Sequence, residues 1–440
     1  MTGYLLNGVY LLLLIILSPY FLLSAIRKGK YREGWAAKFL GRVPVRKGGQ
    51  RCVWFHAVSV GEVQLLTTLV PTLQRENPDW QCVISTTTRT GFALAREKFP
   101  KHLVCYCPLD FTWSTRAAMQ RLRPDLLVLT ELELWPNLIR AAVRRGTKVA
   151  VINGRLSEKS FRGYRRIRPL VARMLRRIDM IAVQHQQYAD RFLQLGATPA
   201  AVRITGSIKF DGAHTDRRNP RTEALRALVG IADDDVVFLA GSTQRPEESL
   251  ALAVYQQLHQ QFPQLRLILV PRHPERFDEV ARLLDDSELP WQRRSALANQ
   301  PLDPPGARIL LVDTVGELGA WWGTASVGFV GGSLGSRGGQ NMIEPSAYGV
   351  AVCFGPHTQN FRDVVQSLLA GEAATVVRDQ AQLLQFVRKC LEDPQAAADQ
   401  GHRAAQLVAA SRGATAKTTE LLGDLFSSNF EGRATYRPAA

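Results

Sequence analysis

The chain has 440 residues, 46% of them hydrophobic, and carries 55 Lys and Arg against 39 Asp and Glu, a formal net charge of +16 at pH 7. This length suffices for two domains with full cores, and the composition excludes a disordered chain. The basic balance predicts an anionic partner, which leaves nucleic acid, anionic lipid and phosphorylated substrates.

The segment from Met1 to Ile26 contains no charged side chain. At about 1.5 Å per residue, its apolar core is long enough to cross a hydrocarbon layer of about 30 Å. Residues 1–27 are therefore predicted to form a transmembrane or deeply embedded anchor. A cleaved signal peptide is the alternative, but the basic start and the small-residue cleavage pattern of such a peptide are missing.

Nine basic residues follow the uncharged run against a single acid, Glu33: Arg27, Lys28, Lys30, Arg32, Lys38, Arg42, Arg46, Lys47 and Arg51. The positive-inside rule places this flank in the cytoplasm and the short N-terminus outside. Basic residues at this position also bind anionic headgroups. A second basic run, Phe161 to Arg177, fits nucleic acid or anionic lipid, and the neighbouring anchor favours lipid. A solvated helix face is the remaining alternative for that run.

After residue 51, short apolar runs alternate with amphipathic stretches, which predicts parallel sheets wrapped by helices. The expected strands of the first series are Cys52–Phe55, Gln81–Ser85, Leu103–Tyr106, Leu126–Thr130, Lys148–Ile152, Met180–Val183 and Val202–Ile204. Those of the second are Val236–Ala240, Leu267–Val270, Ile309–Val312, Val327–Val330, Val350–Phe354 and Thr375–Val377.

The polar run 211–220 lacks periodicity and ends in Pro, so it is interpreted as a linker. The predicted domains are residues 28–210 and 221–426, both Rossmann-like and doubly wound, and residues 427–440 are expected to be disordered. This α/β arrangement predicts a cleft between the domains in which two substrates meet. The six cysteines are scattered through apolar runs without a CxxC pair, which predicts reduced core residues and no metal site.

Acidic and basic side chains stand where strands of the first series end. Glu62 follows the first strand in the stretch WFHAVSVGEVQ, at the start of a helix. A carboxylate at the carboxyl end of a parallel strand can take a proton from a substrate, although a favourable interaction with the helix dipole is the simpler alternative. Glu131 and Glu133 follow another strand, and Lys209 follows the last one.

In the second series, four strands lead into small or polar residues and then a helix: Ala240–Arg245, Val270–Pro274, Val312–Leu318 and Gly331–Pro345. Glycines let the backbone approach a phosphate, and helix N-termini offer free N–H groups. Asn341 and Glu344 share a helix face suited to a ribose diol. Neither a GxGxxG nor a Walker loop is present, and a tight packing turn is the alternative.

The chain resembles the 3-deoxy-D-manno-octulosonic acid (Kdo) transferases, membrane-anchored GT-B glycosyltransferases of lipopolysaccharide synthesis. The resemblance covers the anchor through about residue 425. Besides the anchor it rests on these motifs in order: HAVSVGE, TELELWPN, NGR, TGSIKFD, GST-x-x-x-EE, VPRHPERF, GELG and GGSLGSRGGQNMIEP.

The resemblance implies transfer of Kdo from CMP-Kdo to the 6'-hydroxyl of the lipid A precursor lipid IV(A), with inversion and with neither cofactor nor metal. It implies that Glu62 is the general base and that Glu131 and Lys209 stabilise the transition state. The residues implied to hold CMP are Arg272, His273, Val315, Gly316, Glu317, Asn341, Met342, Ile343 and Glu344. The family commonly has GGHN where this chain has Gly338-Gly339-Gln340-Asn341, and Gln340 cannot carry the charge of an imidazole.

The implied location is the bacterial inner membrane, with a single-pass anchor, the catalytic body in the cytoplasm, anionic lipids as partners and no nucleic acid. Two other functions are compatible with the pattern. A UDP-sugar 2-epimerase-like enzyme would need neither the anchor nor the basic flank. A non-enzymatic lipid-binding module would not explain the glycine-rich loops, which would then have no function. The motifs do not fix how many Kdo units are added.

Overall fold

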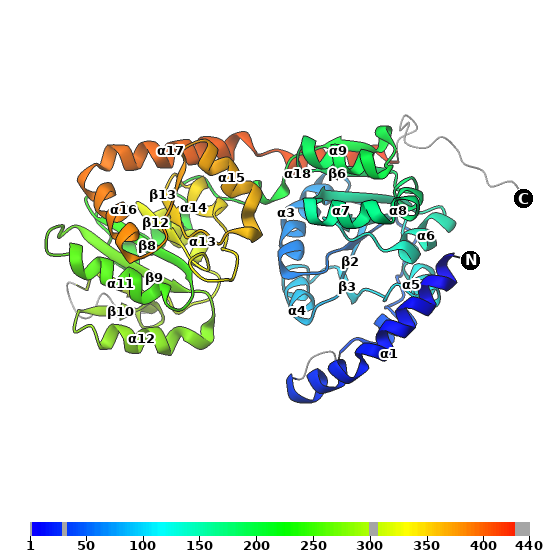
Figure 1. Ribbon diagram of the computed structural model, residues 1–440, viewed down its shortest axis with the longest axis horizontal. Coiled ribbons are helices and arrows are strands. Elements are labelled where there is room, and N and C mark those ends of the chain that lie inside the picture. The colour runs from blue at the N-terminus through cyan, green and yellow to red at the C-terminus, as the bar shows by residue number, and fades with distance from the viewer. Residues whose placement is uncertain (1, 29–32, 299–306, 427–440) are drawn as a thin grey trace, which may run out of the picture. The chain divides into compact units, whose positions relative to one another are not determined.

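The computed structural model describes residues 2–28, 33–298 and 307–426, and the chain forms two compact units (Figure 1). The first unit comprises Met1–Gly212 and Arg412–Ala440, and the second comprises Ala213–Ser411. Each unit contains one seven-stranded sheet in which all pairs of neighbouring strands are parallel. Two doubly wound α/β units were predicted, and this prediction is confirmed.

The first sheet has the strand order β3-β2-β1-β4-β5-β6-β7. Its strands are β1 (Cys52–His56), β2 (Gln81–Thr86), β3 (Leu103–Tyr106), β4 (Leu126–Thr130), β5 (Lys148–Gly154), β6 (Met180–Val183) and β7 (Val202–Ile204). The helices of this unit are α1 (Thr2–Lys28), α2 (Trp35–Leu40), α3 (Val60–Glu76), α4 (Arg89–Lys98), α5 (Thr112–Leu122), α6 (Pro136–Arg144), α7 (Glu158–Arg166), α8 (Arg168–Leu175), α9 (Gln186–Leu195) and α18 (Ala414–Asp424), with short 3-10 turns η1 (Pro199–Ala201) and η2 (Ile208–Phe210).

Alternate residues of each strand in the first sheet face opposite layers, as a parallel sheet buried on both sides requires. Val53 and Phe55 pack with α3, α4 and α18, whereas Cys52 and Trp54 pack with α5, α6, α8 and α9. This two-sided burial explains why the strands read as continuous apolar runs in the sequence.

The second sheet has the order β10-β11-β9-β8-β12-β13-β14. Its strands are β8 (Val236–Thr243), β9 (Leu265–Pro271), β10 (Trp291–Arg293), β11 (Ile309–Leu311), β12 (Val327–Val330), β13 (Ala351–Phe354) and β14 (Ala374–Val376). The helices are α10 (Pro220–Leu228), α11 (Glu247–Leu258), α12 (Phe277–Asp285), α13 (Leu318–Trp321), α14 (Ile343–Ala347), α15 (Arg362–Ala370), α16 (Gln380–Glu392) and α17 (Pro394–Ala410), with 3-10 turns η3 (Pro274–Arg276), η4 (Arg294–Ala298), η5 (Trp322–Thr324) and η6 (Gln359–Phe361).

The predicted domain boundary near the C-terminus is corrected by the structure. The prediction extended the second domain to residue 426, but α18 packs against α3 of the first unit. Ala414, Leu422 and Leu425 complete the apolar layer over β1, and both Asp211 carboxylate oxygens accept hydrogen bonds from the start of α18, one from the amide of Gly413 (2.6 Å) and one from that of Thr415. The predicted disordered tail, residues 427–440, lies outside the described residues.

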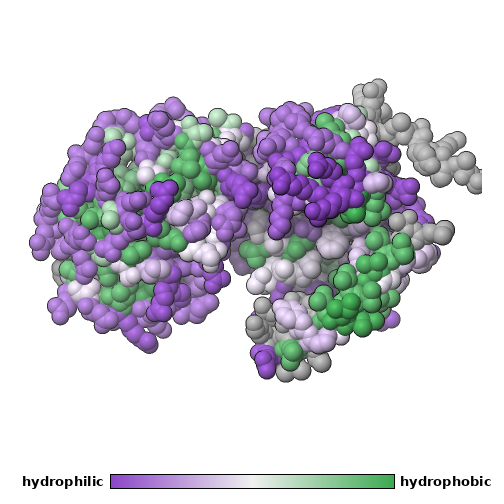
Figure 2. Space-filling view, in the orientation of Figure 1, coloured by the Kyte–Doolittle hydropathy of each residue, from purple (hydrophilic) through white to green (hydrophobic). Residues whose placement is uncertain are grey.

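Helix α1 contains the segment that was predicted to be an anchor. Its residues Gly3–Tyr20 are long and apolar enough to cross a membrane by length and composition. Figure 2 shows apolar side chains gathered along this helix. The exposed ones include Leu5, Leu12, Ile15 and Ile16. The helix is therefore an anchor candidate.

Candidate active site

The two sheets share a feature that marks ligand sites in doubly wound folds. In the first sheet, the strand order changes direction between the parallel strands β1 and β4, and in the second sheet it does so between β8 and β12. Loops diverge at the carboxyl ends of such strand pairs and leave a crevice.

Glu62 enters the first of these sites through the start of α3. Ser59 caps the helix, and its hydroxyl accepts from the amide of Glu62 at 3.4 Å, while the Glu62 carboxylate accepts from the Ser59 hydroxyl at 3.0 Å. The spacing is that of a capping box, a Ser at the N-cap and a Glu three residues later, but the Glu62 carboxylate accepts from the Ser59 hydroxyl and the Val58 amide. The local sequence therefore fixes the direction of the Glu62 side chain.

The Glu62 carboxylate is nearly enclosed, with 8% of the residue exposed. Its Oε2 accepts from the Val58 amide at 2.9 Å and from the Thr130 hydroxyl in a short hydrogen bond, whereas Oε1 accepts from Ser59. Burial raises the pKa of Glu62, and the hydrogen bonds from Thr130, Val58 and Ser59 oppose that rise. A carboxylate with a raised pKa is a stronger base than an exposed one.

Glu131 and Lys209 form an ion pair next to this carboxylate. Glu131 follows Thr130 directly and holds a left-handed backbone conformation with φ of 50°, its amide donating to the Ile152 carbonyl at 2.9 Å. Its Oε1 lies 3.1 Å from the Nζ of Lys209 on η2, and the two side chains are 25% and 27% exposed. The structure thus brings Glu62, Glu131 and Lys209 together, although they lie far apart in the sequence.

A third carboxylate completes the acidic cluster. Glu133 accepts from the indole Nε1 of Trp135 at 2.9 Å. Burial raises the pKa of Glu133 to about 7, and the nearby Glu62 carboxylate adds to the rise. The sequence pointed to Glu133 without a role for it, and it gave no role to Thr130, whose hydroxyl links Glu62 to the Glu131 turn. Thr130 is the last residue of β4, and this position at the end of a strand was the signal that could have identified it.

In the second unit, Glu247 at the start of α11 joins the two loops of the switch point. Its Oε2 accepts from the amides of Gln244 (2.8 Å) and Gly332 (2.7 Å), and its Oε1 from those of Ser333 (2.9 Å) and Leu334 (3.0 Å). The side chain is buried and ties the loop after β8 to the glycine-rich loop after β12. Sequence reasoning missed this role because each loop reads as an independent turn.

The predicted nucleotide residues divide into groups with different surroundings. Asn341 donates to Glu344 at 3.0 Å, and Arg272 lies within electrostatic range of that carboxylate, whose pKa is raised by burial. Arg272 and His273 are exposed after β9. Met342 and Ile343 are buried, so only their backbone groups are available to a ligand.

In the stretch Val315–Glu317 the backbone groups are available to a ligand, whereas the Glu317 carboxylate is not. Val315 is 78% exposed, and Gly316 has a φ of +90° that favours glycine. The carboxylate of Glu317 accepts two hydrogen bonds from Arg294, at 2.9 and 3.0 Å, and one from the Thr314 hydroxyl at 2.7 Å. Its side chain is thereby committed to holding the loop.

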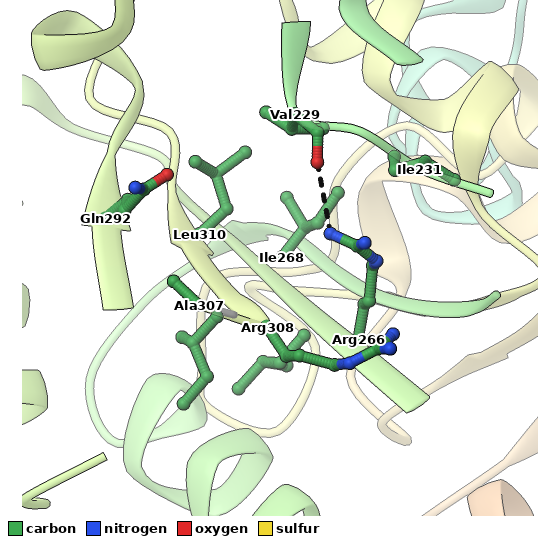
Figure 3. A pocket seen from close by; sticks show the side chains of 10 residues that line it. Val229, Ile231, Arg266, Ile268, Gln292, Ala307, Arg308 and Leu310 are labelled. Atoms are coloured by element: carbon green, nitrogen blue, oxygen red, sulfur yellow. Dashed lines mark hydrogen bonds between the residues drawn. The ribbon is translucent and has the colours of Figure 1, made fainter. Parts of the chain in front are cut away.

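A small pocket lies elsewhere in the second unit (Figure 3). It is lined near the amino-terminal ends of β9 and β11, where Arg266 donates to the Val229 carbonyl at 3.1 Å. None of the predicted site residues lines it. Within the described residues, no group of three or more His, Cys, Asp and Glu side chains is arranged to hold a metal ion.

Two doubly wound units, each with a switch point in its sheet, define the class of two-domain, GT-B-like folds. A solved UDP-GlcNAc 2-epimerase from Neisseria meningitidis, bound to UDP-GlcNAc, has this fold. It superposes with a TM-score of 0.57, covering 85% of this chain and all of its own, at 12% identity. That likeness concerns the fold alone.

The sequence comparisons are more specific. The profile described as 3-deoxy-D-manno-octulosonic-acid transferase matches residues 33–212. The 3-deoxy-D-manno-octulosonic acid transferase of Haemophilus influenzae is 32% identical, covering 94% of this chain and 97% of the relative. That of Bordetella pertussis is 34% identical, covering 95% and 99%. The chain therefore belongs to the Kdo transferase family.

Proposed function

We propose that the protein transfers Kdo from CMP-Kdo to the 6'-hydroxyl of lipid IV(A) at the cytoplasmic side of the inner membrane, with inversion at the sugar carbon and release of CMP. Membership of the Kdo transferase family supports the proposal that the transferred sugar is Kdo. The acceptor, the stereochemistry and the residue roles are argued from the chemistry of the two sites.

The observation that carries the proposal is the Glu62 carboxylate, buried beside an ion pair at the switch point of the first sheet. A sugar hydroxyl is a weak acid and needs a base as its oxygen attacks. Among the residues that the structure describes, the Oε2 of Glu62 accepts two hydrogen bonds, whereas Oε1 accepts one, from the Ser59 hydroxyl. Oε1 therefore has a lone pair left to receive the proton.

In the proposed reaction the acceptor oxygen bonds to the anomeric carbon of Kdo, and the bond from that carbon to the phosphate oxygen of CMP breaks. The CMP leaves with the bonding electrons, and the hydroxyl proton ends on Glu62. The Lys209 ammonium, held by Glu131, stabilises negative charge that develops during transfer.

The second unit supplies groups suited to CMP. The glycine-rich loop presents backbone amides, and Glu247 fixes its position. Such amides and the exposed Arg272 stabilise a phosphate without a metal ion. His273 offers a further donor, and the backbone of Val315, Gly316 and Glu317 a further set of amides. Asn341 and Glu344, with Met342 and Ile343 contributing backbone, complete the proposed CMP site and suit a ribose diol.

The test is the variant Glu62→Gln, incubated with CMP-Kdo and lipid IV(A) and followed by mass spectrometry of the lipid product. Gln has the same size as Glu and its oxygen can still accept a hydrogen bond, but it cannot accept the proton, so we expect transfer to fall by about 10² to 10⁴-fold while CMP-Kdo still binds. Glu76→Gln, at the other end of α3, is the matched control and keeps full activity. Undiminished transfer by Glu62→Gln would remove Glu62 from the mechanism. The product mass also counts the Kdo units added.

A further inference from the structure

Helix α1 presents one narrow stripe to the rest of the first unit. Gly3, Asn7, Tyr10 and Leu14 are buried or partly buried, and their spacing of four, three and four residues places them on one face of a helix. Apart from Leu6 beside this stripe, the other side chains described between Tyr4 and Tyr20 are exposed. Figure 1 shows this end of α1 beside α5 and α6.

The stripe makes polar contacts that a free anchor does not need. Asn7 donates to the Thr112 hydroxyl at 2.7 Å, and its carbonyl oxygen accepts from the Thr112 amide at 3.1 Å. The hydroxyl of Tyr10 donates to Asp110 at 3.1 Å. Asp110 is itself 4% exposed and accepts from the Asn137 amide at 3.0 Å at the start of α6. The first turns of α1 are therefore docked on the body of the catalytic unit.

The other end of α1 is tied to the same body. Lys28 ends the helix, and five residue steps lead to Glu33, a reach of at most about 18 Å. Glu33 accepts from the Tyr106 hydroxyl at 2.9 Å, and α2, which follows it, packs against α5. The start of the apolar helix is thus docked on the first unit, and its end lies within about 18 Å of Glu33 of the same unit.

These attachments conflict with a membrane crossing. Asn7 and Lys28 are separated by about 32 Å along a helix axis, close to the thickness of a hydrocarbon layer. If α1 crossed with Lys28 at the near surface, Asn7 would reach the far surface and leave Thr112 and Asp110 behind. From this geometry we propose that α1 is an in-plane anchor, embedded in a single leaflet with both ends on the side of the catalytic unit.

The exposed surface of α1 fits that position. Residues Leu11–Leu13 and Ile15–Leu17 are exposed all around the helix, so its middle can sink among acyl chains while its backbone hydrogen bonds stay satisfied internally. Its polar stripe is satisfied by the protein. We expect α1 to lie deeper in the leaflet than an ordinary amphipathic interfacial helix, because α1 lacks a charged outer face that would keep it among the headgroups.

A basic cluster adjoins the docked end. Arg140 and Arg144 on α6 and Arg173 on α8 lie within electrostatic range of Arg177. A side chain at Gly3 would place its Cβ 2.8 Å from the Nη1 of Arg140, so this cluster borders the start of α1. Arginines beside an embedded helix bind the anionic headgroups of the same leaflet.

The first experiment is a disulfide test in native membranes with the full-length double variant Asn7→Cys, Thr112→Cys. The native cysteines are all buried, so they give little background. We expect oxidation to form an intramolecular cross-link, seen as a mobility shift on non-reducing gels, in protein that still transfers Kdo. The matched control, Leu17→Cys with Thr112→Cys, places the first cysteine on the exposed part of α1 and should not cross-link.

The second experiment adds a protease-cleavable tag before Met1 and exposes sealed membrane vesicles of both orientations to the protease. An in-plane helix leaves the tag accessible only on the catalytic side. Cleavage only from the opposite side would overturn the proposal, as would the absence of a cross-link in the Asn7→Cys, Thr112→Cys variant. Both outcomes are independent of whether Glu62 is the base.

Discussion

The sequence left two roles open for Glu62, that of a proton acceptor and that of a residue stabilising the start of a helix. The structure shows that the helix-start role exists, because the hydroxyl of the N-cap residue Ser59 accepts from the Glu62 amide and donates to the Glu62 carboxylate. That role does not exclude proton transfer, since the capping contact occupies only one lone pair of Oε1. The pattern predicted the position of Glu62, but its burial and its contact with Thr130 depend on β4, which lies 68 residues away.

The acidic cluster predicts a pH dependence for transfer. The base must be ionised, so kcat/KM rises with pH through the raised pKa of Glu62. Burial raises the pKa of Glu133 to about 7, and the Glu62 charge adds to that rise, so Glu133 stays protonated and uncharged while Glu62 ionises. Glu133→Gln resembles this neutral form, so we expect the acidic limb of the kcat/KM profile to stay in place. A shift of that limb to lower pH would show instead that Glu133 is already charged when Glu62 ionises.

At the scale of elements, the loops after β8 and β12 depend on one carboxylate. In Glu247→Gln one acceptor oxygen becomes an amide group, which leaves two backbone N–H groups facing a donor. Each buried unsatisfied group costs about 1–3 kcal/mol, so we expect the glycine-rich loop to move and the Kd for CMP to rise roughly tenfold or more. Calorimetric titration with CMP measures this.

Glu279→Gln on α12 is a suitable control for that titration, because its carboxylate pairs with the arginines Arg245 and Arg276 and not with the loop amides. As a positioning residue, Glu247 should change CMP affinity and KM for the donor more than it changes the rate with saturating donor. A Glu247→Gln variant with unchanged CMP affinity would contradict this assignment.

The elements themselves were largely predictable from sequence, for a physical reason. Strands buried on both faces, such as β4, are continuous apolar runs and stand out without their partners. The three-residue strand β10 was missed because Trp291–Arg293 is a polar edge segment without such a run. The assignment of α18 was wrong because its partner, α3, lies more than 300 residues earlier, and no local pattern encodes that contact.

For the whole molecule, the net positive charge predicted basic surface, but it could not show which basic residues lie on that surface and which stabilise the fold. Arg46, counted in the predicted lipid-binding flank, is 5% exposed and donates to the carbonyls of Leu122 (2.7 Å), Gln50 (2.9 Å) and Arg123 (3.1 Å). It stabilises the first unit and is not available to headgroups. Charge counts cannot separate such structural arginines from surface ones.

The proposed chemistry relies on amides and Arg272 to stabilise the phosphate, which predicts that a divalent-ion chelator leaves the rate of transfer within about twofold of its normal value. The measurement is Kdo transfer to lipid IV(A) after dialysis against EDTA. As a control, a magnesium-dependent nucleotide enzyme in the same buffer should lose its activity. Loss of transfer that added Mg²⁺ or Mn²⁺ restores would overturn the metal-independent mechanism.

The basic cluster makes a last prediction at the scale of the whole molecule. Arg144 and Arg173 are exposed and, within the described part of the chain, have no acidic partner within ion-pair distance. Because an exposed Lys or Arg near an anionic surface contributes about 1 kcal/mol to binding, the double charge reversal Arg144→Glu, Arg173→Glu should weaken binding to phosphatidylglycerol vesicles by at least tenfold.

Neutral phosphatidylcholine vesicles separate this effect from apolar insertion. The affinity of the charge-reversed protein for them should match that of the unaltered protein, because α1 is intact and buries the same apolar surface. Raising the salt concentration should remove most of the difference on anionic vesicles, since exposed charges are screened. Equal weakening on both kinds of vesicle would instead mean that the substitutions disturb the docking of α1 on α6.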